Sequence, residues 1–354
     1  MPADNLPEAQ SRLIDDEPSQ SVKVSVLSSE KLASRRRWRH LSDKTAKVSI
    51  AVGGISVIVA ILLIFAYLFY EVVPLFAGAT VEEAASYDLQ DSSASLHLAI
   101  EEQSEMAMRL GDDGVARFFD LESGENAATI AVKVPSGATI TSFALDSEQS
   151  GLFALGLNTG EAVVARYAYD TRFAQLDNRR ILTPKIDYPF GEIPYTLAVD
   201  KPLASIALRT SGENMMLAAT ARGGELSLLK ASKQTSLFAA FDLGGGAEFE
   251  IEERRLSGMT LGGEQLFIDG DRFWLFVIDD EGLARLLSLR TAFTAPNPQF
   301  EVQALLTAGR ANPTDISFLL GGISLLVGDD QGAISQWFLT KRDDNVALEK
   351  IRSF

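Results

Sequence analysis

Residues Val48 to Tyr70 form an uninterrupted run that contains no charged side chain. An α-helix rises about 1.5 Å per residue, so this run would be roughly 35 Å long, enough to cross the hydrocarbon core of a bilayer. We therefore predict a transmembrane helix over residues 48–70. The helix divides the chain into a leader, residues 1–47, and a body, residues 71–354.

Charge is distributed unequally around this run. On the N-terminal side, Asp43 is the only acid among a series of basic residues: Lys31, Arg35, Arg36, Arg37, Arg39, Lys44 and Lys47. On the C-terminal side, Glu71, Glu82 and Glu83 come before any basic residue. Short flanks rich in Lys and Arg stay in the cytoplasm. We therefore expect an inner-membrane protein with a cytoplasmic N-terminus and a periplasmic body after about residue 71.

The leader is polar and rich in proline and serine at its start, which predicts a mostly disordered tail that ends in a basic membrane flank. The helix over 48–70 would contact membrane lipid, and the basic flank would lie near anionic headgroups. A cleaved secretory signal is the alternative, with Ala77-Gly78-Ala79 as a small-residue cleavage motif. Signal peptides have shorter apolar regions, so a retained anchor is favoured.

Composition removes several classes of function. The chain has no cysteine, which excludes disulfides, thiolate metal sites and cysteine nucleophiles. Its formal net charge is −16, and such an acidic field disfavours nucleic acid as a partner. The body is long enough to bury a large core.

After the span, short apolar segments alternate with turns that contain glycine and an acidic or polar residue. A weak repeat emerges in which one strand, a glycine turn and a second strand form a hairpin. The five turn glycines are Gly114, Gly160, Gly224, Gly282 and Gly332. The hairpins are 106–121, 152–169, 216–231, 274–289 and 325–339.

Each hairpin is preceded by one further apolar segment, predicted to be a strand. These segments are Leu96–Ile100, Ile140–Leu145, Ser205–Leu208, Leu256–Leu261 and Ile316–Leu320. A fourth strand could precede or follow each group. Units of about 40–50 residues with four antiparallel strands are propeller blades. The stretches 184–202 and 244–263 would be insertions.

We therefore predict a mainly β chain: one transmembrane α-helix followed by a WD40-like β-propeller domain over residues 71–354. The Gly-His and Trp-Asp signatures of WD40 repeats are absent, so the likeness is one of spacing. Five units do not comfortably close a ring, and Lys350–Phe354 resembles the opening of another strand. We expect the propeller to be incomplete in this chain.

The sequence offers little support for an enzyme, and we expect no catalytic, cofactor-binding or metal-binding residues. The sequence has two histidines, His40 in the basic flank and His97 in a strand-like segment. A Ser-His-Asp triad would have to use His97, but no nucleophile elbow accompanies it. His97 is more simply a structural or solvent-facing strand residue.

Four other features have plain structural interpretations. The turns at Asp279-Asp280 and Asp329-Asp330 lack the ligand spacing of a calcium loop and are read as tight hairpins. Gly244-Gly245-Gly246 is not followed by the Lys of a phosphate loop. Trp274 and Trp337 are expected to pack in the core. Within the span, Gly53, Gly54, Ser49 and Ser56 form a small-residue face suited to close helix packing.

One stretch resembles a known family. It comprises Arg36–Arg39, Asp43-Lys44, Val52–Gly54 and the segment from Leu62 to Phe76, which contains Glu71-Val72-Val73-Pro74. This stretch resembles the start of a phosphate-specific ABC transporter permease in its long proteobacterial form. Gln336–Leu339, Lys341–Asp343 and Ile351–Phe354 resemble the interior of that form's periplasmic insertion, which has WD40-like repeats.

The resemblance implies a role in phosphate import and partners in an ABC importer: a permease, an ATPase and a periplasmic phosphate-binding protein. The remaining permease helices have no counterpart here, because no segment after Tyr70 is apolar over the length of a span. No transport residue can therefore be assigned. We expect the membrane-anchored N-terminal region of such a subunit, with a docking domain and no translocation core. The alternative is a stand-alone anchored propeller that acts as a scaffold in the cell envelope.

Overall fold

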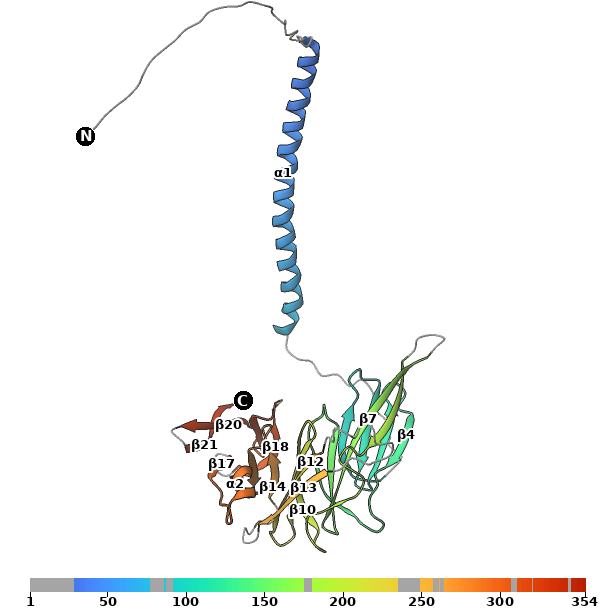
Figure 1. The fold of residues 1–354 in the computed structure, drawn as a ribbon, viewed down its shortest axis with the longest axis vertical. Coiled ribbons are helices and arrows are strands. Elements are labelled where there is room, and N and C mark those ends of the chain that lie inside the picture. The colour runs from blue at the N-terminus through green and yellow to red at the C-terminus, as the bar shows by residue number, and fades with distance from the viewer. Residues whose placement is uncertain are drawn as a thin grey trace, which may run out of the picture. The chain divides into compact units, whose positions relative to one another are not determined.

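The computed structural model describes residues 29–76, 86, 92–174, 180–234, 249–256, 261, 264–306, 311–319, 321–342 and 345–354. They fall into two compact units, Met1–Ala84 and Ala85–Phe354. The described part of the first unit is helical, and the second unit is built from β-sheets (Figure 1).

The first unit contains the long helix α1 (Ser29–Val72), followed by the short 3-10 helix η1 (Val73–Phe76). The part from Ser42 to Phe76 has a mean hydropathy of 2.8 in its most apolar stretch, and no residue of that stretch is buried among the described residues. It is long and apolar enough to cross a bilayer. The helix begins well before Val48, so the basic flank is helical too.

The second unit begins with two sheets. The first sheet comprises β1 (Ser95–Ile100), β2 (Met106–Gly111), β3 (Val115–Asp120) and β4 (Asn126–Ala131). The second sheet comprises β5 (Ile140–Leu145), β6 (Leu152–Leu157), β7 (Glu161–Phe173) and β8 (Arg180–Asp187), with the two-residue strand β9 (Tyr195–Thr196) paired to β7.

Three more sheets follow in sequence order. The third sheet has β10 (Leu203–Ser211), β11 (Asn214–Ala221), β12 (Leu226–Lys233) and β13 (Phe249–Leu256). The fourth has β14 (Gln265–Ile268), β15 (Trp274–Ile278), β16 (Leu283–Ser288) and β17 (Val302–Leu305), with the short helix α2 (Leu289–Thr294) after β16. The fifth has β18 (Pro313–Phe318), β19 (Ser324–Asp329), β20 (Ile334–Arg342) and β21 (Asn345–Ser353).

Within each sheet, consecutive strands pair antiparallel, so each sheet is an up-and-down meander. The described buried apolar residues form four clusters, each shared by two consecutive sheets, and none of the four joins the fifth sheet to the first. Four-stranded meanders packed face to face in sequence order are the architecture of a β-propeller. The described residues thus form five blades in an open series (Figure 1).

The predicted fold class is therefore confirmed: the chain is mainly β, with one apolar N-terminal helix and a propeller-like unit. All five glycine hairpins form, and the fourth strand follows each of them. The turn glycines adopt positive φ; Gly114 has φ +75° and Gly160 has φ +89°. This conformation costs a side chain with a Cβ about 1–2 kcal/mol, which explains the glycines.

Three sequence-based assignments are wrong. Leu256 ends β13 of the third sheet, so the strand that precedes the fourth hairpin is β14 (Gln265–Ile268) and not Leu256–Leu261; residues 257–260 lie outside the described part. The predicted insertions include strands, because β8 reaches Asp187 and β13 begins at Phe249. Lys350–Ser353 completes β21, the last strand of the fifth sheet, and opens no further unit. Gly244–Gly246 lies outside the described residues.

Candidate functional site

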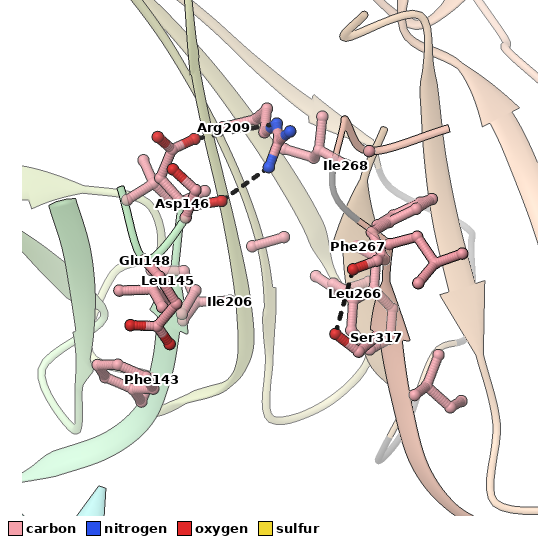
Figure 2. Close-up of a pocket in the computed structure, with 18 of the residues that line it drawn as sticks. Phe143, Leu145, Asp146, Glu148, Ile206, Arg209, Leu266, Phe267, Ile268 and Ser317 are labelled. Atoms are coloured by element: carbon pink, nitrogen blue, oxygen red, sulfur yellow. Dashed lines mark hydrogen bonds and ion pairs between the residues drawn. The ribbon is translucent and has the colours of Figure 1, made fainter. Parts of the chain in front are cut away.

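The first strands of four sheets surround a central cavity of about 570 Å³. Its walls come from β5, β10, β14 and β18, the first strands of the second to fifth sheets, and from the loops that follow β5 and β18. Apolar side chains form much of the lining: Leu145, Ile206, Leu208, Leu266, Ile268, Ile316 and Phe318. Figure 2 shows Leu145 and Ile206 on one side of this space and Leu266, Phe267 and Ile268 on the other. A cavity of this volume falls in the usual range for small-molecule sites.

A charged cluster lies where the first strands end. Asp146 follows β5, Arg209 lies in β10 and Asp269 follows β14. The Asp146 carboxylate accepts hydrogen bonds from the Thr210 backbone N–H and the Thr210 hydroxyl, each at 2.8 Å. Arg209 Nη1 donates to the Asp146 carbonyl oxygen at 2.7 Å (Figure 2). The second sheet is thereby fastened to the third at the rim of the cavity.

The same rim joins the fourth and fifth sheets. The Gly270 N–H donates to the Gly322 carbonyl at 2.8 Å, and a Cβ on Gly270 would lie 2.4 Å from the Gly321 carbonyl oxygen. Only glycine permits this approach of two backbones. Burial raises the pKa of Asp269, while hydrogen bonds from the backbone N–H groups of Trp274 and Phe273, both 2.8 Å, oppose the shift. These contacts hold the rim in place; they place no nucleophile beside a base.

His97 lies at the boundary of the first and second sheets. Its ring stacks on Phe143 of β5 with centroids 5.6 Å apart, and the ring of Tyr167 of β7 lies 5.8 Å away. Burial lowers the pKa of His97, and the negative charge of Glu148, whose Oε2 is 3.6 Å from Nε2, opposes this shift. The prediction of a structural strand position holds, but the side chain is nine-tenths buried rather than solvent-facing.

The acidic turns behave as tight hairpins. Asp279 Oδ1 accepts from the N–H groups of Glu281 and Leu283, and Asp329 Oδ1 accepts from those of Gln331 and Ala333. Their carboxylates thus bind the turn backbone. Among the described residues, no group of three or more His, Cys, Asp or Glu side chains could hold a metal ion.

Arg117 of β3 and Arg285 of β16, each in the strand after its hairpin turn, have a shared role. Arg117 Nη2 lies 2.6 Å from Asp113 Oδ2, and Arg285 Nη2 lies 3.4 Å from Asp279 Oδ2. Each therefore pairs with the acid of its own hairpin turn. Trp337 is buried between the fourth and fifth sheets and Trp274 is partly buried there, as predicted.

Sequence reasoning missed the rim contacts. Arg209 and Asp146 are 63 positions apart, and neither belongs to the hairpin repeat. A usable signal exists only after the blades are aligned: a polar residue follows or ends the first strand in the second, third and fourth sheets.

No protein-family model matches the chain, and no curated protein matches it. Among solved structures it is similar to the β-propeller domain of Cps50 (Swd1) from Myceliophteria thermophila, with 13% identity, a TM-score of 0.43 and coverage of 75% of this chain and 72% of that chain. It is also similar to Hsv2 of Kluyveromyces lactis, complete loop 6CD, with 14% identity, a TM-score of 0.42 and coverage of 74% of each chain. Both likenesses are distant, and the sheet topology itself establishes the propeller-like architecture.

Proposed function

We propose that this chain is the membrane-anchored N-terminal region of a phosphate ABC importer permease subunit, whose periplasmic propeller-like domain docks protein partners. The observation that carries the anchor is the long apolar stretch of α1 between Ser42 and Phe76. The basic residues before it and the acidic residues after it support a cytoplasmic N-terminus. The link to phosphate is supported only by the sequence resemblance, which is most specific over residues 36–76 and extends to short segments between 336 and 354.

A docking role is supported by the form of the second unit. The blades are tied together by buried apolar clusters and by polar contacts at the cavity rim, which makes a rigid platform with many exposed turns. Turns held by a rigid scaffold are common places for recognition. A docking domain needs no catalytic group, and the described contacts of His97, Asp279 and Asp329 are structural.

The partners in this proposal are a permease, an ATPase and a periplasmic phosphate-binding protein. The full chain with an affinity tag is expressed in cells with a phosphate importer, crosslinked in intact membranes and purified. We expect the importer subunits to be enriched over an unrelated single-span protein of the same topology. In a matched variant, an unrelated apolar helix replaces residues 48–70, and partners that dock on the propeller should be retained.

Two outcomes would overturn the proposal. Enrichment of other envelope proteins without any importer subunit would favour the stand-alone scaffold. Recovery of no partner by either version, with the chain folded and inserted, would contradict docking altogether.

A further inference from the structure

His97 is an ionisable side chain that packs against the apolar cluster between the first and second sheets. It lies in β1, and its side chain is only 10% exposed. Its pairing partner on β2 is Leu110, which is fully buried in the cluster shared by the first and second sheets. Phe143 from β5 stacks on the ring with an interplanar angle of 23°. The imidazole therefore occupies a position that suits an apolar ring.

One ring nitrogen of His97 lacks a hydrogen-bond partner. Nε2 is buried and makes no hydrogen bond. The titratable groups that face it from the second sheet are the Glu148 carboxylate, with Oε2 at 3.6 Å, and Tyr167 of β7, whose hydroxyl donates to the same Glu148 oxygen at 3.2 Å. The second sheet thus presents one negative charge to the buried Nε2, that of Glu148, and this carboxylate already accepts a hydrogen bond from Tyr167.

We propose that His97 is an acid-sensitive lock between the first and second sheets, and that protonation of its imidazole loosens the first sheet from the second. A protonated imidazole buried in this boundary loses its hydration, and its attraction to the Glu148 carboxylate offsets only part of that cost. In acid, the open state, in which water hydrates His97, is therefore favoured over the closed state. Phe143 and Glu148 also border the central cavity. Loosening the first sheet therefore uncovers one side of that cavity wall.

The direction and the size of the effect follow from linkage. Burial holds the pKa of His97 below its ordinary value of 6.5, so the opened state binds the proton more tightly than the closed state. Above about pH 6.5 the ring is neutral in both states and the boundary is unaffected. As the pH falls below that value, the opening equilibrium constant rises by at most about tenfold per pH unit, and it levels off at the pKa of the closed state.

Histidine NMR tests the first half of this proposal on the full chain in nanodiscs. The sequence has two histidines, so His40→Gln leaves His97 as the sole imidazole signal. We expect a titration midpoint below 6.5, and a still lower midpoint in Glu148→Gln, which removes the charge but keeps a hydrogen-bond acceptor for Tyr167. A midpoint at or above 6.5 would overturn the proposal.

Hydrogen exchange tests the second half. After correction for the intrinsic exchange rate, the opening constant of β1 amides should rise several-fold between about pH 7 and pH 5, while amides of β11 and β12 in the third sheet stay constant. His97→Phe, which keeps an aromatic ring on Phe143, should abolish the rise, and Glu148→Gln should enlarge it. An identical pH response in wild type and His97→Phe, or an equal rise in all five sheets, would refute the lock.

Discussion

The two sheet boundaries on either side of the second sheet have similar apolar clusters, but each contains a buried ionisable side chain whose hydrogen bonding differs between them. Between the second and third sheets, the buried Asp146 carboxylate receives two hydrogen bonds from Thr210 of the neighbouring sheet. Between the first and second sheets, the buried His97 Nε2 receives none. Matched polar groups fix a boundary under all ordinary conditions, whereas an unmatched titratable group makes it depend on pH.

Turn glycines offer the sharpest contrast between the boundaries. A Cβ on Gly160 would lie 2.3 Å from the Ala198 carbonyl oxygen and 2.9 Å from that of Lys201, both in the connection from the second to the third sheet. At Gly114, facing the first boundary, the nearest atom is Ile140 Cδ1 at 3.4 Å. We expect Gly160→Ala to cost about 3 kcal/mol or more, because backbone must move, and Gly114→Ala about 1–2 kcal/mol from its positive φ alone.

Urea denaturation of both variants, followed by tryptophan fluorescence, measures these costs. Equal losses would mean that the close packing around Gly160 does not tie the second sheet to the third.

Removal of the Asp146 carboxylate should have the next largest effect. Asp146→Ala leaves the Thr210 N–H and hydroxyl without their acceptor and takes an opposite charge from beside Arg209. We expect a loss of about 2–4 kcal/mol in the free energy of unfolding. Asp170→Ala, which removes an exposed partner of Lys185 in the same sheet, is the control and should leave the unfolding midpoint unchanged. A harmless Asp146→Ala would show that the rim contacts contribute little.

A smaller, separable pH effect is expected at the outer end of the first boundary. Arg180 of β8 hydrogen-bonds Glu101, and this bond holds the pKa of Glu101 below its usual value of 4.5. The unfolded chain therefore binds this proton more tightly, so the stabilisation is present above about pH 4.5 and is lost as the pH falls through the folded pKa. Glu101→Gln should cost about 1 kcal/mol at pH 7 and nothing in strong acid.

Denaturation curves at several pH values check this expectation. The Glu101 contribution should fade below pH 4.5, while the His97 contribution begins below pH 6.5. A Glu101→Gln cost that persists unchanged at low pH would contradict the assigned ion pair.

Local chemistry explains which parts of the fold were predictable from sequence. The hairpins at Gly114 and Gly160 were found because a positive-φ glycine and an alternating strand leave a mark within a few residues. The fourth strands were not placed, since outer strands such as β13 are polar and largely exposed. The cavity rim was missed for another reason: Asp146 and Thr210 are 64 positions apart, and only folding brings them together.

Cysteine labelling tests the membrane arrangement most directly, because the chain has no cysteine of its own. Ser42 and Ala127 are both exposed, one at the start of the apolar part of α1 and the other in β4. In cells with an intact inner membrane, a membrane-impermeant maleimide should label Ala127→Cys and spare Ser42→Cys until the membrane is broken. Labelling of Ser42→Cys with protection of Ala127→Cys would place the propeller in the cytoplasm and contradict a periplasmic docking domain.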